Sequence, residues 1–245
     1  MKYYDKFKAD KYSGNGEDGI MLRMFYELKI NPNNSWCVDV GAYDGIYCSN
    51  VRILIDMDAN AVMIEPSIVG GLCETKFETL KELPKQFPKV TALNYVVVPP
   101  VWTKEQRESV ANGIQLNDDR CGKEREEDLV AMELDDILKE TNIPEDYDLL
   151  NIDTDTCDHE IWQGHKKYKP KIVIIEINSS VSPDELGHVG EGTSYADSME
   201  VAKEMGYSLV CHSGNMIYVR DDILDKLHIP KTFINSVDLF NRSWL

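Results

Sequence analysis

The chain has 245 residues, of which 42% are hydrophobic, and it carries a formal net charge of −17. This length and composition suit one large domain with a hydrophobic core, so we predict a single domain over residues 1–245. A protein that grips nucleic acid needs a basic footprint, and the sequence has no stripe of Lys or Arg. The acidic balance therefore argues against nucleic-acid partners and against anionic membranes.

The sequence also favours a cytoplasmic protein. It contains no run of about 18 apolar residues that could span a membrane, and its charged first eleven residues do not resemble a signal peptide. The six cysteines are scattered and form neither a C-x-x-C pair nor a zinc spacing, which is typical of reduced thiols. We expect a small-molecule or glycan substrate as the partner, and the sequence leaves the oligomeric state open.

Helical and strand patterns alternate along the chain, which predicts a mostly parallel sheet covered by helices on both faces. Clusters of breaking residues, such as Pro99-Pro100, separate the patterns. In chain order we predict a helix over Glu17 to Leu28, a strand over Trp36 to Val40, a helix over Cys48 to Met57, a strand over Ala61 to Ile64, a helix over Glu74 to Leu83 and a third strand within Val90 to Val98.

The second half begins with a segment that has no clear period. Residues 101–128 are polar and charged, which favours a mobile or cap-like insertion. Residues 179–193 are expected to form a glycine-containing loop. The other predicted elements are a helix over Leu129 to Glu140 with a short strand as an alternative start, a strand over Tyr147 to Ile152, a helix over Asp158 to Tyr168, a strand over Lys171 to Ile177 and a helix over Ser194 to Met205.

Two β-rich runs follow the last helix. Tyr207 to Cys211 and Met216 to Arg220 flank a tight-turn signal at residues 212–215. A parallel sheet that finishes in an antiparallel hairpin differs from the ordinary dinucleotide-binding fold. We therefore predict an α/β fold of the Rossmann-like methyltransferase type, with a seven-stranded, mostly parallel sheet and helices on both faces.

The first strand leads into a glycine motif, Val38-Asp39-Val40-Gly41-Ala42-Tyr43-Asp44-Gly45. Gly41 and Gly45 allow close approach of the backbone to a ligand, and doubly wound sheets bind ligands at the carboxyl ends of their strands. The spacing D-x-G-x-x-x-G differs from the G-x-G-x-x-G of nicotinamide sites. Asp39 suits the ammonium and sulfonium charges of S-adenosylmethionine, and we expect Ala42 to line the same turn. The alternative is a glycine-rich turn without a ligand.

The second predicted strand ends in Ile64-Glu65-Pro66, which places an acid 24 residues after Gly41. A carboxylate at this point can accept hydrogen bonds from both hydroxyls of a ribose. An isolated Glu at a strand end is usually only solvated. Its combination with the glycine motif instead predicts that Glu65 and Pro66 bind a cofactor.

Further acids follow the fourth and fifth strands. Asp153 ends one strand, with Asp155 and Asp158 close behind it, and Glu176 and Asn178 end the next. Asp153 and Glu176 are candidates for catalysis or for contact with the cofactor or substrate. Together with Asn178 they could hold Mg²⁺, which prefers oxygen ligands. The alternative for Asp155 and Asp158 is capping of the following helix.

Four of the five histidines are each a weak candidate for a general base, namely His159, His165, His188 and His212. His188 lies in the glycine-containing loop that we expect to cover the pocket. We therefore prefer it among the histidines as the group that takes a proton, against the alternative of a surface histidine.

At this point the sequence resembles a known family, the FkbM-type S-adenosylmethionine-dependent methyltransferases. The resemblance covers most of the chain in order. It rests on Tyr12 to Ile20, Val38 to Gly45, Ile64 to Pro66, Leu149 to Asp155 followed by Trp162-Gln163-Gly164, Lys169 to Asn178, and Gly206 to Val210 with the final hairpin.

The resemblance implies methyl transfer, mostly to oxygen, on sugars and natural products. It implies contacts to S-adenosylmethionine by Asp39, Gly41 and Glu65, and also by Glu17 and Asp153. The sequence departs from the family pattern at Gly14, where Gln is usual, and at Thr156-Cys157 after the acidic motif. These departures put the catalytic assignment in doubt more than the cofactor assignment.

The leading hypothesis is S-adenosylmethionine-dependent O-methylation of a small polyhydroxylated molecule such as a sugar or glycan end. A methyltransferase acting on a nitrogen or a carboxylate is the first alternative, and a catalytically silent protein that binds the cofactor is the second. A nicotinamide-dependent oxidoreductase is disfavoured because the third glycine of the phosphate-binding motif is absent.

Overall fold

A computed structural model of the chain describes residues 3–67, 77–111, 129–154, 157–177 and 195–229. The predicted site residues Asn178 and His188 lie outside the described residues, as do Asp155 and the whole loop over 179–193. Within the described ranges, no helix is long and apolar enough to cross a membrane.

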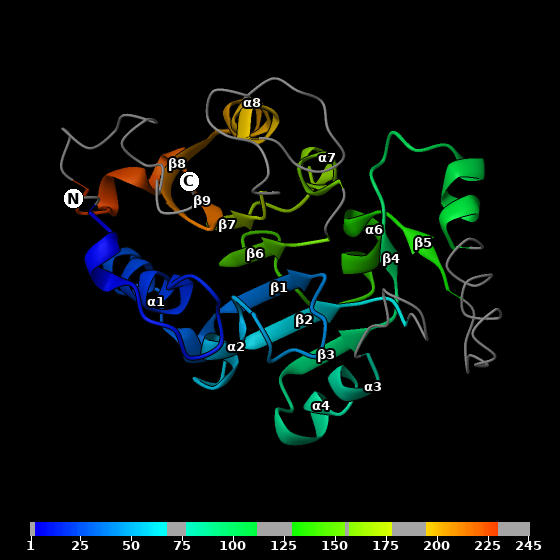
Figure 1. The fold of residues 1–245 in the computed structure, drawn as a ribbon, viewed down its shortest axis with the longest axis horizontal. Helices are drawn as coiled ribbons and strands as arrows, with labels where there is room; N and C mark the ends of the chain where they lie inside the picture. Colours follow the sequence, from blue (N-terminus) through cyan, green and yellow to red (C-terminus); the bar gives the residue numbers. More distant parts are fainter. Residues whose placement is uncertain (1–2, 68–76, 112–128, 155–156, 178–194, 230–245) are drawn as a thin grey trace.

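A central sheet of seven strands organises the fold (Figure 1). The strand order is β3-β2-β1-β6-β7-β9-β8. Neighbouring strands are parallel from β3 to β7, whereas β9 is antiparallel to both β7 and β8. The strands are β1 (Trp36–Val40), β2 (Asn60–Ile64), β3 (Val90–Leu93), β6 (Leu149–Ile152), β7 (Ile172–Ile175), β8 (Tyr207–Ser213) and β9 (Asn215–Arg220).

This topology confirms the predicted fold class. The chain moves outward from β1 to β3, returns to β6 on the other side of β1, and ends in an antiparallel hairpin around Gly214. That is the strand order of the Rossmann-like methyltransferase fold. The reversal of direction between β1 and β6 is a topological switch point, where open α/β sheets bind their ligands.

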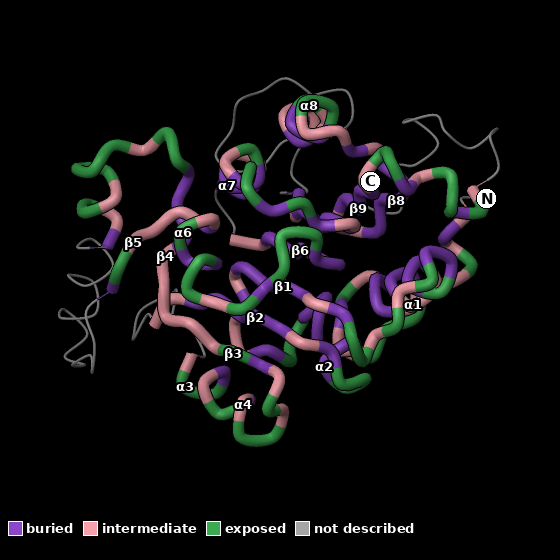
Figure 2. The backbone as a smooth tube through the Cα atoms, turned by 180° about the vertical axis from the view of Figure 1, so that it is seen from behind, coloured by how far each residue is buried: buried purple, intermediate pink, exposed green. Residues whose placement is uncertain are grey.

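Helices cover both faces of the sheet, and the buried side chains divide into two clusters accordingly. The strands form the buried centre of the molecule, and the exposed positions lie on the outer helices and loops (Figure 2). On one face pack α1 (Glu17–Leu28), α2 (Arg52–Ile55), α3 (Phe77–Leu80), α4 (Leu83–Gln86) and the 3-10 helix η4 (Asp221–Lys226). On the other pack α6 (Leu134–Lys139), α7 (Asp158–Gly164) and α8 (Tyr195–Met205).

The predicted helix α1 and strand β1 have the observed bounds, but several helices are shorter than predicted. The helix expected over Cys48 to Met57 contains only α2, because residues 44–50 form turns and Cys48 has a left-handed φ of 53°. The described part of the helix expected over 74–83 is interrupted after α3, since Pro84 has no N–H to donate to the carbonyl of Leu80. The helix expected to reach Tyr168 ends at Gly164.

The chain adds one small feature that the sequence only partly predicted. Two short parallel strands, β4 (Val96–Val97) and β5 (Ala131–Met132), pair beside the main sheet. The short strand before α6 thus confirms the alternative start, and α6 itself begins only at Leu134. Of the predicted insertion, residues 104–111 are helical, and 112–128 lie outside the described residues.

A buried polar chain joins α6 and α7 beneath the start of β6. Tyr147 donates its hydroxyl hydrogen to Nε2 of His165 over 2.8 Å, and Nδ1 of His165 lies 2.5 Å from Asp135. Burial lowers the pKa of His165, which favours the neutral ring with its proton on Nδ1. His165 therefore joins α6 and α7 as a buried histidine with a partner at each ring nitrogen, and it is not part of the candidate site.

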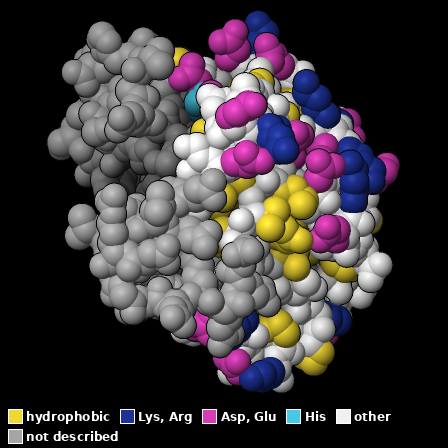
Figure 3. All heavy atoms as spheres, turned by 90° about the vertical axis from the view of Figure 1, so that its right-hand side faces the viewer, with side chains coloured by type: hydrophobic (Ala, Val, Ile, Leu, Met, Phe, Trp, Pro, Cys, Tyr) yellow, Lys and Arg dark blue, Asp and Glu magenta, His cyan; other side chains and the backbone are white. Residues whose placement is uncertain are grey.

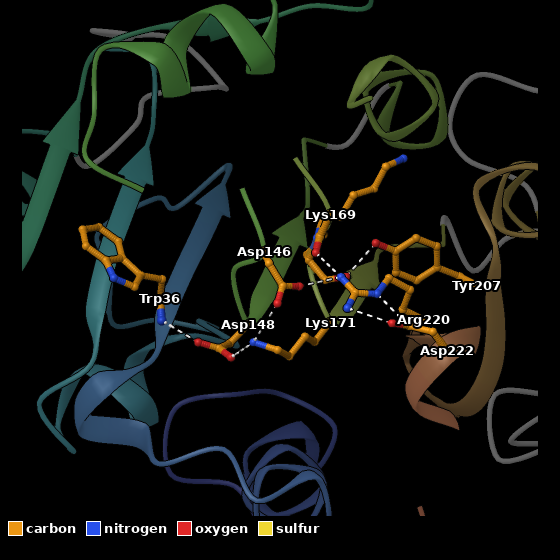
Figure 4. Close-up of polar contacts among 9 residues, drawn as sticks. Trp36, Asp146, Asp148, Lys169, Lys171, Tyr207, Arg220 and Asp222 are labelled. Carbon is orange, nitrogen blue, oxygen red and sulfur yellow. Dashed lines mark hydrogen bonds and ion pairs between the residues drawn. The ribbon is translucent and has the colours of Figure 1, made fainter. Parts of the chain in front are cut away.

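A second polar network ties the amino edge of the sheet, far from the carboxyl ends of the parallel strands (Figure 4). Arg220, at the end of β9, donates to Asp146, Asp222 and the carbonyl of Lys169 over 2.6–2.7 Å. Next to it, Asp148 accepts from the ammonium of Lys171 over 2.7 Å and from the main-chain N–H of Trp36 over 2.9 Å (Figure 4). These contacts join β1, β6, β7 and β9 at one end.

Candidate functional site

The predicted site residues follow four neighbouring strands at the same level. The main-chain N–H groups of Gly41, Glu65, Asp153 and Glu176 each donate to the carbonyl of the last residue of an adjacent strand, over 2.9–3.2 Å. These four residues follow β1, β2, β6 and β7, so the hydrogen bonding of the sheet continues one step beyond the strands. The carboxyl edge thereby carries three acids, Glu65, Asp153 and Glu176, on both sides of the glycine turn.

Gly41 is required by close packing within the protein. Its φ is 81°, and a Cβ at this position would lie 1.7 Å from the carbonyl oxygen of Asp153. Gly45 has a φ of 70°, and its Cβ would lie 2.5 Å from Cδ1 of Leu83. The protein's own groups therefore already require a glycine at both positions, and the further role of these glycines in making room for a ligand stays a prediction.

Asp39 is almost fully buried on the face of the sheet that α1 and α2 cover, and both of its carboxylate oxygens are hydrogen-bonded. Asn151 on β6 donates to one oxygen over 2.8 Å, and the hydroxyl of Ser49 donates to the other over 3.2 Å. Asn50 in turn donates to Asn151 over 3.0 Å. Burial raises the pKa of Asp39 to about 6, and the hydrogen bonds from Asn151 and Ser49 offset part of this effect.

This arrangement changes what Asp39 can do. Each carboxylate oxygen could accept a further hydrogen bond, but a cofactor would have to reach an almost fully buried group, so the role of Asp39 as a binding residue stays a prediction. Sequence reasoning did not identify Ser49, Asn50 and Asn151 as partners of the acid. The one available signal was a polar Asn in an otherwise apolar strand, Leu149–Ile152.

Glu65 lies at the end of β2, beside the turn that follows β1. Its side chain is largely buried, and Oε2 accepts a hydrogen bond from the main-chain N–H of Tyr43 over 2.9 Å. The carboxylate thus faces the turn that follows β1. Ala42 is buried in the same turn, and its N–H donates to the carbonyl of Ile64 over 3.2 Å. Pro66 is half-buried beyond Glu65.

Glu17 reaches the same edge of the sheet from the start of α1. It accepts from the main-chain N–H of Asn15 over 2.9 Å and from the amide of Asn215 over 3.4 Å. Asn215 begins β9, whose next residue pairs with the last residue of β7. Burial raises the pKa of Glu17 to about 6. The structure therefore adds a second buried acid with a raised pKa at the carboxyl edge.

Two further predictions concern Asp158 and the magnesium site. Asp158, in the first turn of α7, accepts from the main-chain N–H of Thr154 over 2.9 Å. Thr154 precedes the helix, and α7 has no side-chain cap hydrogen bond, so this contact is not the predicted capping. In the described part of the chain, no group of three His, Cys, Asp or Glu side chains is arranged to hold a metal ion. The predicted ligand Asn178 lies outside the described residues, and the magnesium site finds no support.

The side of the molecule toward which β1, β2 and β6 run is shown in Figure 3. On its described surface, Lys and Arg side chains are interspersed with Asp and Glu, and hydrophobic side chains form a group between them (Figure 3). At the opposite, amino edge a cleft of about 390 Å³ opens between the end of α1, the start of β1 and η4. None of the predicted site residues lines that cleft.

No known family profile and no curated protein matches this sequence. Among solved structures, the chain is similar to the TYW2 protein of M. jannaschii in complex with AdoMet, with 12% identity and a TM-score of 0.38, over 84% of this chain and 74% of that one. It is also similar to an O-methyltransferase from Bacillus cereus in complex with SAH, with 13% identity and a TM-score of 0.37, over 82% and 81% of the two chains. Neither similarity decides the reaction of this chain.

Proposed function

We propose that this chain is an S-adenosylmethionine-dependent methyltransferase. The observation that supports this most is the position of Glu65. Its carboxylate lies beside the glycine turn of β1, one strand away from the switch point between β1 and β6, and it accepts a hydrogen bond there from the N–H of Tyr43. A carboxylate so placed suits the two hydroxyls of a ribose, and the neighbouring acids suit a cationic nucleoside.

The turn after β1 disfavours a dinucleotide. A pyrophosphate is usually held by the N-terminus of a helix that starts within the glycine motif. Here the next helix, α2, begins only at Arg52 and has four residues. Between Gly41 and α2 the chain forms turns, and Gly45 packs against Leu80 and Leu83 instead of facing a phosphate. A nucleoside without phosphate fits this turn better.

The residues present fit S-adenosylmethionine as follows. When bound, the cofactor supplies an electrophilic methyl group on a sulfonium. Glu65 would accept from the ribose hydroxyls, and the turn at Gly41 and Ala42 would support the cofactor. Asp153 and Glu176, one residue past β6 and β7, are the described groups that would orient the acceptor and take its proton. His188 remains a predicted alternative base.

For the acceptor, we propose an oxygen of a small polyhydroxylated molecule such as a sugar. The resemblance of the sequence motifs supports this class, and the acids at the carboxyl edge disfavour an anionic acceptor. Transfer to a nitrogen or a carboxylate is the alternative.

Isothermal titration with S-adenosylmethionine and with NAD tests the proposal. We expect only S-adenosylmethionine to bind. Glu65→Gln keeps an oxygen for the N–H of Tyr43 but removes the charge, and loss of charge-assisted bonds to a ribose should weaken binding by about tenfold or more. Glu145→Ala is the matched control, because its side chain is 70% exposed at the other end of the sheet. Binding of NAD instead, or equal affinity in all three proteins, would refute the proposal.

A further inference from the structure

Large apolar side chains are exposed directly after the glycine turn. Tyr47 is 70% exposed and Ile46 is 40% exposed, and Tyr43 is half-buried between them and the sheet. The rings of Tyr43 and Tyr47 meet edge to face, with centroids 6.3 Å apart. Within the described residues, neither hydroxyl has a hydrogen-bond partner. Exposed aromatic side chains that are grouped in this way favour an interaction site over ordinary surface.

The main chain holds these side chains in fixed positions. Oδ1 of Asp44 accepts from the N–H groups of Ile46 and Tyr47 over 2.8 and 2.7 Å, and Tyr43 donates its N–H to Glu65. Gly45 fixes the middle of the loop by packing on the helices beneath it. The aromatic side chains therefore stand on a preformed loop, which lowers the entropic cost of binding a ligand.

Two residues of this loop have a strained backbone. Tyr43 has a φ of 50° and Cys48 a φ of 53°, in the left-handed region that residues with a Cβ rarely adopt. Such strain costs about 1–3 kcal/mol per residue and persists where function requires the conformation. The strain at Tyr43 directs its N–H to Glu65, so the aromatic loop and the proposed cofactor-binding acid are joined as one unit.

The charges of the loop restrict the ligand. Residues 41–51 contain no Lys or Arg, and Arg52 is turned toward Asp56, over 3.1 Å. The charged groups that the loop presents or contacts are Asp44 and Glu65. An anion would be repelled, whereas a neutral ring can place a flat apolar face on a tyrosine.

We propose that the loop over residues 43–47 is the acceptor-binding surface, and that Tyr43 and Tyr47 hold an uncharged acceptor by contact with the flat face of its ring. This inference rests on the proposed function, since it needs the cofactor to bind next to Glu65. It assigns two specificity-determining residues and an uncharged cyclic acceptor, which is either a saturated ring with hydroxyl groups or an aromatic ring.

Saturation-transfer NMR on the protein loaded with S-adenosylhomocysteine tests the inference. The probes are methyl β-D-glucopyranoside for a saturated ring, resorcinol for an aromatic ring and glucuronate as a charged counterpart. We expect transfer to one of the two neutral probes and weaker transfer to glucuronate. Tyr47→Ala should weaken binding of the neutral probe about three- to tenfold, and Tyr43→Ala should have a similar effect.

Tyr26→Ala is the matched control, because Tyr26 is 73% exposed on α1 and has no place in the loop. It should leave the neutral probe bound as in the parent protein. Far-UV circular dichroism checks that each variant is folded, and titration with S-adenosylhomocysteine should give the parent affinity in Tyr47→Ala and Tyr26→Ala.

The outcomes separate this inference from the proposed function. If S-adenosylhomocysteine fails to bind the parent protein, the proposed function is wrong. If it binds but no neutral probe does, or if all variants bind the probe equally, the acceptor surface is wrong and the function stands. A matching loss of cofactor affinity in Tyr47→Ala would make Tyr47 a cofactor residue and overturn the inference. Conversion of an oligomer to a monomer by the same variant would make the loop an interface between copies, with the same consequence.

Discussion

The charge of the buried Asp39 lowers the free energy of unfolding, and a neutral replacement should recover that stability. Asp39 therefore allows a direct test of the energetics at the carboxyl edge of the sheet. Asp39→Asn keeps the shape of the side chain. Its amide oxygen can accept from Asn151, as a carboxylate oxygen of Asp39 does. Its nitrogen faces the hydroxyl of Ser49, which already accepts from the N–H groups of Val51 and Arg52, so the hydrogen bond that Ser49 donates is lost. This loss does not change with pH, whereas the ionisation at position 39 is removed.

The expected effect depends on pH in a defined direction. The pKa of Asp39 rises from its ordinary value of 3.8 to about 6 in the folded protein, because burial disfavours the charged form. The folded state then favours the protonated acid, so this group stabilises the fold fully below pH 4, and that stability is lost as the pH rises to about 6. Above this range, ionised Asp39 costs the fold roughly 3 kcal/mol relative to its protonated form.

Urea unfolding of both proteins at pH 4, 5, 6 and 7 measures this effect. The difference in the free energy of unfolding, variant minus parent, should increase by roughly 2 kcal/mol between pH 4 and pH 7, because pH 4 is still close to the unfolded pKa. Other titrating groups cancel in this difference, among them His165, whose lowered pKa makes both proteins less stable as the pH falls below about 6.5. A difference that stays flat with pH would refute the reasoning. If the charge serves the cofactor, the variant will also bind S-adenosylmethionine more weakly.

Three further predictions concern the packing around the sheet. Gly41→Ala should cost about 2–6 kcal/mol of stability by urea unfolding, from backbone strain and overlap with a carbonyl, whereas Gly206→Ala, with a φ of 79° and open space around it, should cost only the strain. Equal losses in the two would contradict the close approach. Tyr147→Phe leaves Nε2 of His165 without its donor and should cost about 1–3 kcal/mol, and a neutral result would mean that this bond contributes nothing. Arg220→Met removes the hydrogen bonds of Arg220 to three partners and should lower the free energy of unfolding by about 1–3 kcal/mol. The loss should appear as a lower thermal midpoint, and an unchanged midpoint would refute this.

The sequence predicted the sheet well because its strands are buried on both faces. Apolar runs such as Ile172–Ile175 have one explanation in an α/β protein, and the antiparallel hairpin followed from the turn signal around Gly214. Helix α1 was predicted to the residue, since its apolar face repeats with helical period and Lys29 closes it in a left-handed conformation.

The short helices were harder to predict, because tertiary contacts decide where they end. Cys48 was predicted to begin a helix, but the chain before Arg52 forms turns and bends that hydrogen bonds to Glu65 and Asp39 hold in place. These partners lie on other strands. Local propensity cannot report them, so α2 was predicted too long.

The candidate site was predicted as a set of positions, and its internal contacts were not. Spacing and strand ends placed Glu65, Asp153 and Glu176 on one edge, as the main-chain hydrogen bonds show. The partners of Asp39 could not be predicted, because Ser49 and Asn151 are far apart in the sequence and meet only through the parallel register of β1 and β6.

Two kinds of feature that lower stability, buried charge and strained backbone, lie at the carboxyl edge of the sheet, and the described amino-edge network has neither. Asp39 and Glu17 are buried acids whose pKa values burial raises, and Tyr43 and Cys48 carry strained backbone. Two other described residues with a left-handed backbone, Lys29 and Asp58, close a helix and a turn, where this conformation is ordinary. The amino-edge network, by contrast, pairs its charged groups with partners (Figure 4). Selection for stability alone would remove buried charge and strain, so their concentration at the carboxyl edge supports the proposal that this edge binds a ligand.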